Sequence, residues 1–298
     1  MFKIKWDPYN NGVILSEYIE ESEAIIAPRP VYVEELKMLE LDKAFNLPKN
    51  NIPVCWEIDR RYYYCGDMIF ETKKGNIYEE PLVIINEEHR GKTLKPIDIR
   101  RIIQINEKVL GVIENEAMDF IKQKYEEYQK RDVARFVVAF SGGKDSQVTL
   151  DLVSRVIPHE KFTTVFTNTG MELPCTIDLI QITEKFYQKK YPDFKIVQAL
   201  SEKPAIDMWK KYGPPSRMNR WCCSVLKTAL FGREMKKLLN VNSQPYMVVF
   251  EGVRNDESSK RASYNRVGEG VKHVKLINCR PVLKWNLTEI YLYLYKNN

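Results

Sequence analysis

The chain has 298 residues, of which 44% are hydrophobic and 29% are charged, a composition that is typical of a globular protein and excludes a largely disordered one. The length predicts one or two domains. The formal net charge of +6 suits a polyanionic ligand such as a nucleotide, but a lysine-rich surface explains it equally well, so the charge does not choose between partners.

Neither a membrane span nor a secretory signal is predicted. No run of about 18 apolar residues occurs, and the first residues, Met-Phe-Lys-Ile-Lys-Trp-Asp-Pro, lack an apolar core. Six cysteines, at positions 55, 65, 175, 222, 223 and 279, do not form a secreted disulfide framework in a chain of this length. We therefore expect a cytoplasmic protein with reduced thiols and no membrane partner.

Residues 1–105 are divided into short segments by prolines, and we expect a small α+β domain here. The segment Trp56–Phe70 alternates as in a β-hairpin, with turns predicted at Gly66-Asp67 and Gly75-Asn76. An amphipathic helix is predicted over Pro30–Leu41.

Between Ile99 and Gln129 the pattern is helical, since apolar residues recur on one face at 102, 105, 109, 113, 117, 120, 121 and 125. We expect residues 106–130 to form a helix that connects the small domain to a second domain over 131–298.

The second domain alternates strands and helices. Strands are predicted at Phe136–Phe140, Phe162–Gly170 and Tyr246–Arg254, and a helix is predicted over Pro174–Gln188. Strands that alternate with helices indicate a parallel sheet, with the ligand at the carboxyl ends of the strands.

A turn rich in small residues, Ser-Gly-Gly-Lys-Asp-Ser at 141–146, joins the first of these strands to a helical pattern. Its glycines allow backbone amides to approach a phosphate, the helix dipole favours negative charge, and Lys144 adds a cation. Asp145 and Ser146 are suited to capping the helix or to helping hold a metal. The spacing differs from that of the Walker phosphate loop.

This turn resembles the loop of the PP-loop ATP pyrophosphatases, the superfamily that includes phosphoadenosine phosphosulfate (PAPS) reductases. Three later segments are similar to the PAPS reductase family in the same order. They are Thr167-Asn-Thr-Gly-Met-Glu-Leu-Pro174, in which Asn168 replaces the family's acidic residue, Arg220-Trp-Cys-Cys-Ser-Val-Leu-Lys227, and Gly252-Val-Arg-Asn-Asp-Glu-Ser258 followed by Arg261.

The resemblance implies a Rossmann-like three-layer α/β sandwich with a mostly parallel sheet, of the adenine nucleotide alpha hydrolase-like kind. It implies ATP or PAPS as the ligand, with Mg²⁺. The residues implied to bind the nucleotide are Ser141, Gly142, Gly143, Lys144, Asp145, Ser146, Asn168, Thr169, Gly170, Glu172, Arg217, Arg220, Lys227, Gly252, Arg254, Glu257, Ser258 and Arg261. Lys144, Cys222, Cys223 and Arg254 are the implied catalytic residues, and Asp145 is the implied metal ligand.

Iron-sulfur members of this family use the Cys-Cys element for two of four cluster ligands. After Cys223 only Cys279 follows in these 298 residues, so a 4Fe-4S cluster is expected only if further cysteines lie beyond residue 298. Either the sequence is a truncated form or the cluster is absent.

Three functions compete. The first, which we favour, is an ATP pyrophosphatase-type sulfurtransferase that activates a nucleic-acid or protein acceptor. The second is a PAPS reductase that releases sulfite, although the family's C-terminal Glu-Cys-Gly-x-His tail is missing from the sequence. The third is a nucleotide sensor without catalysis. A homodimer is expected only from the family.

Overall fold

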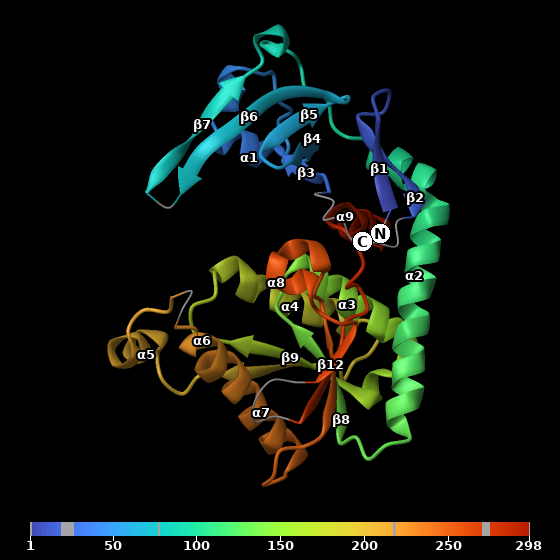
Figure 1. Cartoon of the computed structure of the whole chain (residues 1–298), viewed down its shortest axis with the longest axis vertical. Helices are drawn as coiled ribbons and strands as arrows, with labels where there is room; N and C mark the ends of the chain where they lie inside the picture. The colour runs from blue at the N-terminus through green and yellow to red at the C-terminus, as the bar shows by residue number, and fades with distance from the viewer. Residues whose placement is uncertain (1, 19–26, 77, 217–218, 270–274, 298) are drawn as a thin grey trace. The chain divides into compact units, whose positions relative to one another are not determined.

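The computed structural model describes residues 2–18, 27–76, 78–216, 219–269 and 275–297 (Figure 1). They form two compact units that alternate along the chain. The first unit contains Met1–Ile113, Asn255–Ala262 and Lys284–Asn298, and the second contains Glu114–Arg254 and Ser263–Leu283. Helix α2 (Ile99–Gln129) contributes to both units, and its bounds confirm the helix predicted from the sequence.

The second unit is built on a six-stranded sheet with the order β10-β9-β8-β11-β13-β12. All neighbours pair in parallel except β12, which runs antiparallel to β13. The strands are β8 (Arg135–Phe140), β9 (Phe162–Asn168), β10 (Ile196–Leu200), β11 (Met247–Glu251), β12 (Val267–Glu269) and β13 (Leu276–Cys279).

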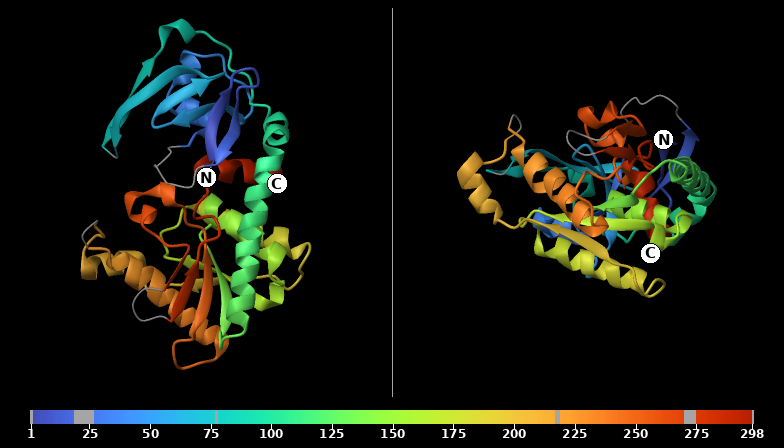
Figure 2. Two further views of the ribbon diagram at one scale, coloured as in Figure 1. Left: turned by 45° about the vertical axis from the view of Figure 1, so that its right-hand side comes forward. Right: turned by 90° about the horizontal axis from the view of Figure 1, so that it is seen from below.

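Helices lie on both faces of this sheet (Figure 2), which confirms the three-layer α/β sandwich predicted from the sequence. They include α3 (Lys144–Val156), α4 (Pro174–Gln188), α5 (Ala205–Tyr212), the short α6 (Trp221–Cys223), a π-helical turn over Ser224–Thr228, and α7 (Ala229–Leu239). The bounds of α4 are those predicted. The chain moves from β8 to β9 and β10 on one side and then returns to β11 on the other, so the strand order reverses between β8 and β11.

Strand β8 lies in the interior of the sheet, between β9 and β11, and its side chains are buried on both faces. Val137 and Val138 are fully buried, and α3 packs the apolar residues Val148, Leu152 and Val153 toward the interior. A run that is apolar on both faces is typical of a buried parallel strand, and the observed β8 confirms the prediction. The carboxyl ends of β8, β9 and β11 meet at one edge, since Ala139 pairs with Val165 and with Glu251.

The first unit contains a five-stranded antiparallel sheet with the order β3-β4-β5-β6-β7 and a separate hairpin of β1 and β2. The strands are β1 (Phe2–Asp7), β2 (Gly12–Tyr18), β3 (Arg29–Tyr32), β4 (Pro53–Ile58), β5 (Arg61–Tyr64), β6 (Asp67–Asn76) and β7 (Glu79–Ile85). Helices α1 (Val33–Met38), α8 (Ser259–Ala262) and α9 (Leu287–Asn297) belong to the same unit. The antiparallel strands with short helices fit the α+β character predicted for this part of the chain.

Two local predictions in this unit are wrong. The predicted helix over Pro30–Leu41 begins only at Val33, because Arg29–Tyr32 forms β3, an edge strand in which Pro30 is tolerated although it has no amide hydrogen to donate. The turn predicted at Gly75-Asn76 lies later in the chain, since β6 continues to Asn76, which pairs with Glu79. The hairpin turn at Gly66 is confirmed.

The division into domains at residues 105 and 130 stays a prediction. Two later segments, Asn255–Ala262 and Lys284–Asn298, pack with the first unit. Over the part of the chain that the structure describes, no helix combines the length and apolar character needed to cross a lipid bilayer.

Candidate functional site

The loop between β8 and α3 is held by its own two serines. The Ser146 hydroxyl donates to the Gly143 carbonyl at 2.8 Å and accepts from the Ser141 amide at 3.2 Å. Gly142 has a φ of +76°, a left-handed conformation that favours glycine, and an added Cβ would lie 3.3 Å from the Thr176 side chain. The glycine in the sequence is therefore needed for the shape of the loop.

The N-terminus of α3 is open. Its N-cap residue is Gly143, which has no side chain to cap the helix. Among the described residues, the amides of Gly142, Lys144 and Asp145 donate to no acceptor. Unpaired amides at a helix N-terminus, reinforced by the helix dipole, make a binding site for an anion.

A buried ion pair lies directly behind this loop. The Arg254 guanidinium Nε is 2.6 Å from Asp145 Oδ1, and the two side chains are only 4% and 10% exposed. Lys144 Nζ lies 3.1 Å from the other carboxylate oxygen of Asp145. Asp145 therefore has a cation at each oxygen, and Arg254, just after β11, ties the end of that strand to the first turn of α3.

Gly252 brings the backbone of the same two elements into contact. A Cβ added there would lie 2.4 Å from the Asp145 carbonyl oxygen and 2.6 Å from the Ser146 nitrogen. These are backbone atoms, so they cannot rotate away as a flexible side chain would. Glycine at 252 is thus required by close packing at the point where the strand order reverses.

The loop between β9 and α4 supplies a carboxylate. Glu172 Oε1 accepts hydrogen bonds from the Thr169 hydroxyl at 2.8 Å and from the Thr169 amide at 3.3 Å. Asn168 accepts a bond from the Gly170 amide at 2.9 Å, so its side chain shapes the loop. The conformation of this loop therefore positions Glu172.

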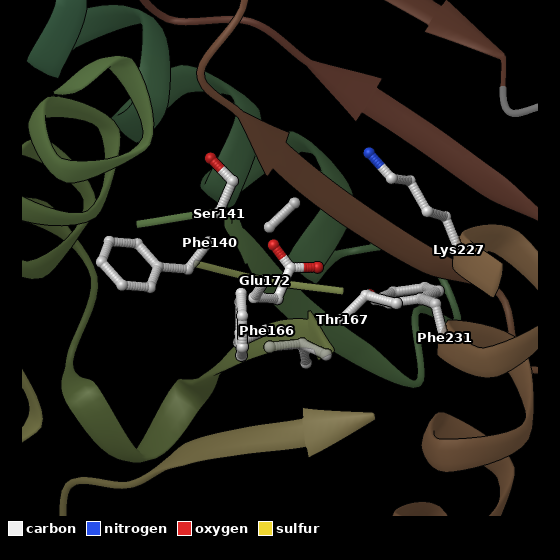
Figure 3. A pocket seen from close by; sticks show the side chains of 9 residues that line it. Phe140, Ser141, Phe166, Thr167, Glu172, Lys227 and Phe231 are labelled. Atoms are coloured by element: carbon white, nitrogen blue, oxygen red, sulfur yellow. The ribbon is translucent and has the colours of Figure 1, made fainter. Parts of the chain in front are cut away.

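Glu172 lines a pocket of about 190 Å³ at the carboxyl ends of β8 and β9 (Figure 3). In this view the Glu172 carboxylate is seen between Ser141 and Lys227. The remaining lining is mostly apolar and comes from Ala139, Phe140, Val165, Phe166, Thr167 and Phe231. The pocket thus combines an apolar wall with one carboxylate and one ammonium group, beside the phosphate-type loop.

Lys227 reaches this pocket from the π-helical turn that follows α6. A π-helical turn inserts one extra residue per turn and changes the direction of the side chains that follow it, and such turns are frequent at functional sites. The structure therefore brings three of the four segments singled out in the sequence together in the pocket, through Ser141, Glu172 and Lys227. Arg254 of the fourth segment lies behind the loop, paired with Asp145.

The two adjacent cysteines lie outside the lining of the pocket. Cys222 is partly exposed and Cys223 is exposed, and both belong to α6, directly before the π-helical turn. Arg220 is the N-cap residue of α6. Cys279 is fully buried in β13, and burial raises its pKa to about 12, so it stays protonated at neutral pH.

Some predicted residues are not part of this arrangement. Glu257, Ser258 and Arg261 belong to the first unit, where Arg261 forms an ion pair with Glu257. Arg217 lies outside the described residues. The fourth sequence motif is therefore divided, with Gly252 and Arg254 in the second unit and its later residues in the first.

A protein-only metal site is not evident in the described ranges, since no group of three or more His, Cys, Asp or Glu side chains gathers there. Each carboxylate oxygen of Asp145 already lies beside a cation, Arg254 or Lys144, so its role as a Mg²⁺ ligand stays a prediction. The sequence analysis missed the apolar lining, above all Phe231, although strand ends in a parallel sheet are where such lining is expected.

Comparisons with known proteins agree with the sequence motifs. The sequence matches the phosphoadenosine phosphosulfate reductase domain over residues 135–298. It is similar to two uncharacterized proteins of Methanocaldococcus jannaschii, with 32% identity over 65% of this chain and 38% of the relative, and with 30% identity over 70% of this chain and 47% of the relative. The chain thus matches less than half the length of either protein.

A third relative is the adenosine 5′-phosphosulfate reductase of Bacillus anthracis, with 24% identity over 61% of this chain and 73% of the relative. Among solved structures, an FMN adenylyltransferase of Candida glabrata is similar with a TM-score of 0.44 and 14% identity, over 64% of this chain and 57% of that one. The match to the reductase domain covers more than half of the sequence and includes all four motifs, so the chain belongs to the phosphoadenosine phosphosulfate reductase domain family.

Proposed function

We propose that the chain binds ATP with its phosphates at the loop 141–146 and its adenosine in the pocket beside it, and activates an acceptor for sulfur transfer. The observation that carries this proposal is the open N-terminus of α3, whose amides face no acceptor among the described residues and whose first turn is fixed by the buried Asp145–Arg254 pair. Hydrogen-bond donors that are already fixed in place need not rearrange when negative charge develops on a phosphate, so they stabilise that charge at little cost in free energy.

In the proposed reaction, an oxygen of the acceptor attacks the α-phosphorus of ATP. A bond from that oxygen to phosphorus forms, the bond from phosphorus to the bridging oxygen breaks, and pyrophosphate leaves. Lys144 would stabilise charge on the phosphates, and Arg254 would keep Asp145 and the loop in position. Mg²⁺, if bound through Asp145 and the phosphates, would add positive charge there, and no step of the proposal depends on it.

Glu172 supports ATP over PAPS. A carboxylate in a nucleotide pocket can accept a hydrogen bond from a ribose hydroxyl, whereas it repels a phosphate in that position. Dinucleotide-binding proteins use an acidic residue in this way to bind NAD, which has a ribose hydroxyl where NADP has a phosphate. PAPS has a phosphate where ATP has a free hydroxyl. Because the Thr169 amide and hydroxyl hold Glu172 in the pocket, its charge would act against PAPS.

Cys222 or Cys223 would carry the sulfur as a persulfide, received from a persulfide donor whose own thiol is released, since both are at least partly exposed and precede the turn that delivers Lys227 to the pocket. The terminal sulfur would attack the acceptor carbon that bears the adenylated oxygen, and AMP would leave with that oxygen. An external thiol would then reduce the resulting disulfide and release the thiolated acceptor. The acceptor, a nucleic acid or a protein, stays open, and we place the reaction in the cytoplasm. The second candidate is PAPS reduction, which the reductase domain match and the similarity to an adenosine 5′-phosphosulfate reductase favour.

Parallel calorimetric titrations with PAPS and with ATP, each with and without Mg²⁺, test the choice of ligand. ATP should bind at least tenfold more tightly than PAPS, a difference of about 1.4 kcal/mol. In Glu172→Gln the preference should shrink mainly through tighter binding of PAPS. A tenfold preference for PAPS in the unmodified chain would instead restore the reductase function, and binding of neither nucleotide would end both.

Catalysis is tested separately by isotope exchange between pyrophosphate and ATP, with bulk cellular RNA or protein supplied as the acceptor of the adenylyl group. This exchange separates the enzyme from a nucleotide sensor. Lys144→Ala should abolish exchange. Sulfur transfer to any acceptor that supports turnover should be lost in the double variant Cys222→Ala/Cys223→Ala, while ATP binding persists. Sulfur transfer that survives in this double variant would remove the cysteines from the proposal.

A further inference from the structure

The first unit contains a pocket of its own, on one face of the five-stranded sheet. Its volume is about 430 Å³, more than twice that of the pocket lined by Glu172, and volumes of this size are typical of sites for small molecules. The lining comes from all five strands, from the turn between β4 and β5 and from the end of α1. None of these residues takes part in the reaction proposed above.

The floor of this pocket is a fixed network of polar side chains. Tyr62 and Thr72 are only 8% and 9% exposed, and their hydroxyls are hydrogen-bonded to each other. Arg29 Nε donates to one Glu57 carboxylate oxygen at 2.9 Å, and the other oxygen accepts from the Arg60 amide at 2.6 Å. Arg29 also donates to Glu35, outside the lining, at 2.7 Å. The floor groups therefore bind one another, and an ionic ligand has to be attracted by the rim.

Two cations stand at the rim without an acidic partner. Arg60 and Lys74 line the pocket and are exposed, and neither forms an ion pair with any residue that the structure describes. Arg60 Nη1 donates to the Lys74 carbonyl, so the two residues are held together at one end of the pocket. A guanidinium group beside an ammonium group is an arrangement that binds the oxygens of carboxylates and phosphates.

The rest of the lining limits the kind of anion. Leu39 and Pro81 supply apolar surface, so an anion that fills the pocket needs an apolar group as well as its charged head. Glu79 lies exposed at the rim, where it accepts a bond from the Asn76 side-chain amide at 3.3 Å. Because its carboxylate repels negative charge, a ligand with one or two charges fits better than a triphosphate.

We propose that this pocket is a second binding site, which takes a small organic oxyanion, either a carboxylate or a phosphate monoester, that carries an apolar group. Its head group binds Arg60 and Lys74, and its apolar group lies against Leu39 and Pro81. The inference does not depend on the nucleotide or on the reaction proposed above. Failure of either proposal would leave the other intact.

The sheet supplies matched controls for the two rim cations. Lys73 and Arg61 are their neighbours in the sequence and are also exposed, but Lys73 forms an ion pair with Glu71 and Arg61 lies opposite Glu71 in the adjacent strand. Because side chains alternate along a strand, these two cations point away from the face that carries Tyr62 and Thr72. Removing them changes the net charge by the same amount at the opposite face.

Calorimetric titration with phenyl phosphate and with benzoate tests the site, in saturating ATP so that the loop 141–146 is occupied. Arg60→Gln/Lys74→Gln should weaken binding of the preferred probe at least tenfold, whereas Arg61→Gln/Lys73→Gln should keep it within about twofold. Arg60→Gly suits the φ of +64° at this position, so it should fold normally and still bind more weakly. Circular dichroism checks the fold of every variant.

Two further measurements test the sign of the charge and the need for an apolar group. Glu79→Gln removes the repelling carboxylate and should tighten binding about two- to threefold. Inorganic phosphate should bind at least tenfold more weakly than phenyl phosphate, because it leaves the apolar wall empty. The ratio of the affinities for phenyl phosphate and benzoate identifies the preferred head group.

Three results would overturn the inference. Binding of neither probe at millimolar concentrations means that the pocket is not an anion site. Equal losses in the two double variants mean that the probes respond to net charge and not to this face of the sheet. Inorganic phosphate that binds as well as phenyl phosphate means that the rim holds ions without using the pocket.

Discussion

Two helices of this chain, α3 in the second unit and α9 in the first, begin with a buried carboxylate, but their N-termini are completed in opposite ways. In α9 the N-cap Asn286 and Glu289 bond each other's amides, at 2.9 and 2.8 Å, and Asp256 accepts a bond from the Leu287 amide. In α3 the N-cap is Gly143, and the carboxylate of Asp145 is paired with Arg254 instead.

The difference separates a structural helix start from one suited to a ligand. The reciprocal bonds of α9 form a capping box, which leaves little for a ligand to add. The start of α3 is held by Arg254 and by the backbone at Gly252, but the amides of Lys144 and Asp145 find no acceptor within the part of the chain that the structure describes. A helix N-terminus that is rigid and still uncapped is therefore the more informative signal for an anion site.

Gly252→Ala should have the largest effect, because it pushes a Cβ into backbone atoms that support the open helix start. We expect the free energy of unfolding to fall by more than about 3 kcal/mol and nucleotide binding to be lost. Urea denaturation and ATP titration measure the two effects. Gly111→Ala in α2, where an added Cβ meets nothing within 4 Å, is the control and should be neutral or slightly stabilising. Equal stability of the two variants would contradict the close approach.

Arg254→Met should destabilise the chain by roughly 3 kcal/mol, because it leaves the buried Asp145 carboxylate without its closest cation. Adding Asp145→Asn should recover a large part of this loss, since the double variant buries no unpaired charge at the site. A double-mutant cycle by urea denaturation measures this coupling. If the two single effects simply add, the pair does not hold the loop.

The start of α9 predicts that the stability of the chain depends on pH. Burial raises the pKa of Glu289 to about 7 from 4.5, despite the amides that bond its carboxylate. The folded state therefore binds this proton more tightly than the unfolded state, and stability should fall as the pH rises from about 4.5 to 7, by roughly 2–3 kcal/mol. Glu289→Gln should lack this part of the pH dependence. Parallel slopes for the two proteins would exclude Glu289 as its cause.

Gly143→Asp would make α3 resemble α9 and should have the smallest effect on stability. Gly143 has a φ of −79°, which other residues adopt, so an aspartate can cap the helix and add a few tenths of a kcal/mol. Its charge would occupy the anion site, and we expect ATP to bind at least tenfold more weakly. Gly143→Ala, which adds no cap and no charge, is the control. Unchanged affinity in the aspartate variant would place the phosphates elsewhere.

The sequence predicted those parts of the structure that depend on local pattern. Helices α2 and α4 and the strand β8 are confirmed because each has a long or fully apolar periodic pattern. The glycine loop could likewise be located, since its residues are contiguous. The residues that contact this loop from distant parts of the chain could not be located. The contact of Arg254 with Asp145, for example, depends on the pairing of β11 with β8, which are more than a hundred residues apart.

Three further features were not predicted because they also depend on contacts between residues that are far apart in the sequence. Residues 30–32 were predicted as the start of a helix because the pairing of β3 with β4 cannot be recognised from a local stretch of sequence. The division of the fourth motif between two units was also not predictable, since Asn255–Ala262 packs with a part of the chain made much earlier. The contribution of Phe231 to the pocket likewise depends on how α7 packs on the sheet.

The contacts of α9 have a consequence for how the protein folds as it is synthesised. Glu289 accepts the Phe2 amide at 2.9 Å, Thr288 donates to the Pro28 carbonyl, and the hydroxyls of Tyr295 and Tyr32 lie 2.7 Å apart. Strands β1 and β3 leave the ribosome early, but α9 is made only after residues 114–283 of the second unit. The first unit therefore cannot complete its packing until α9 has been synthesised, whereas the second unit can fold before that. In a nascent chain that is stalled before residue 287, the Phe2 amide and the apolar edge at β3 would lack their α9 partners and would be exposed to chaperones and proteases.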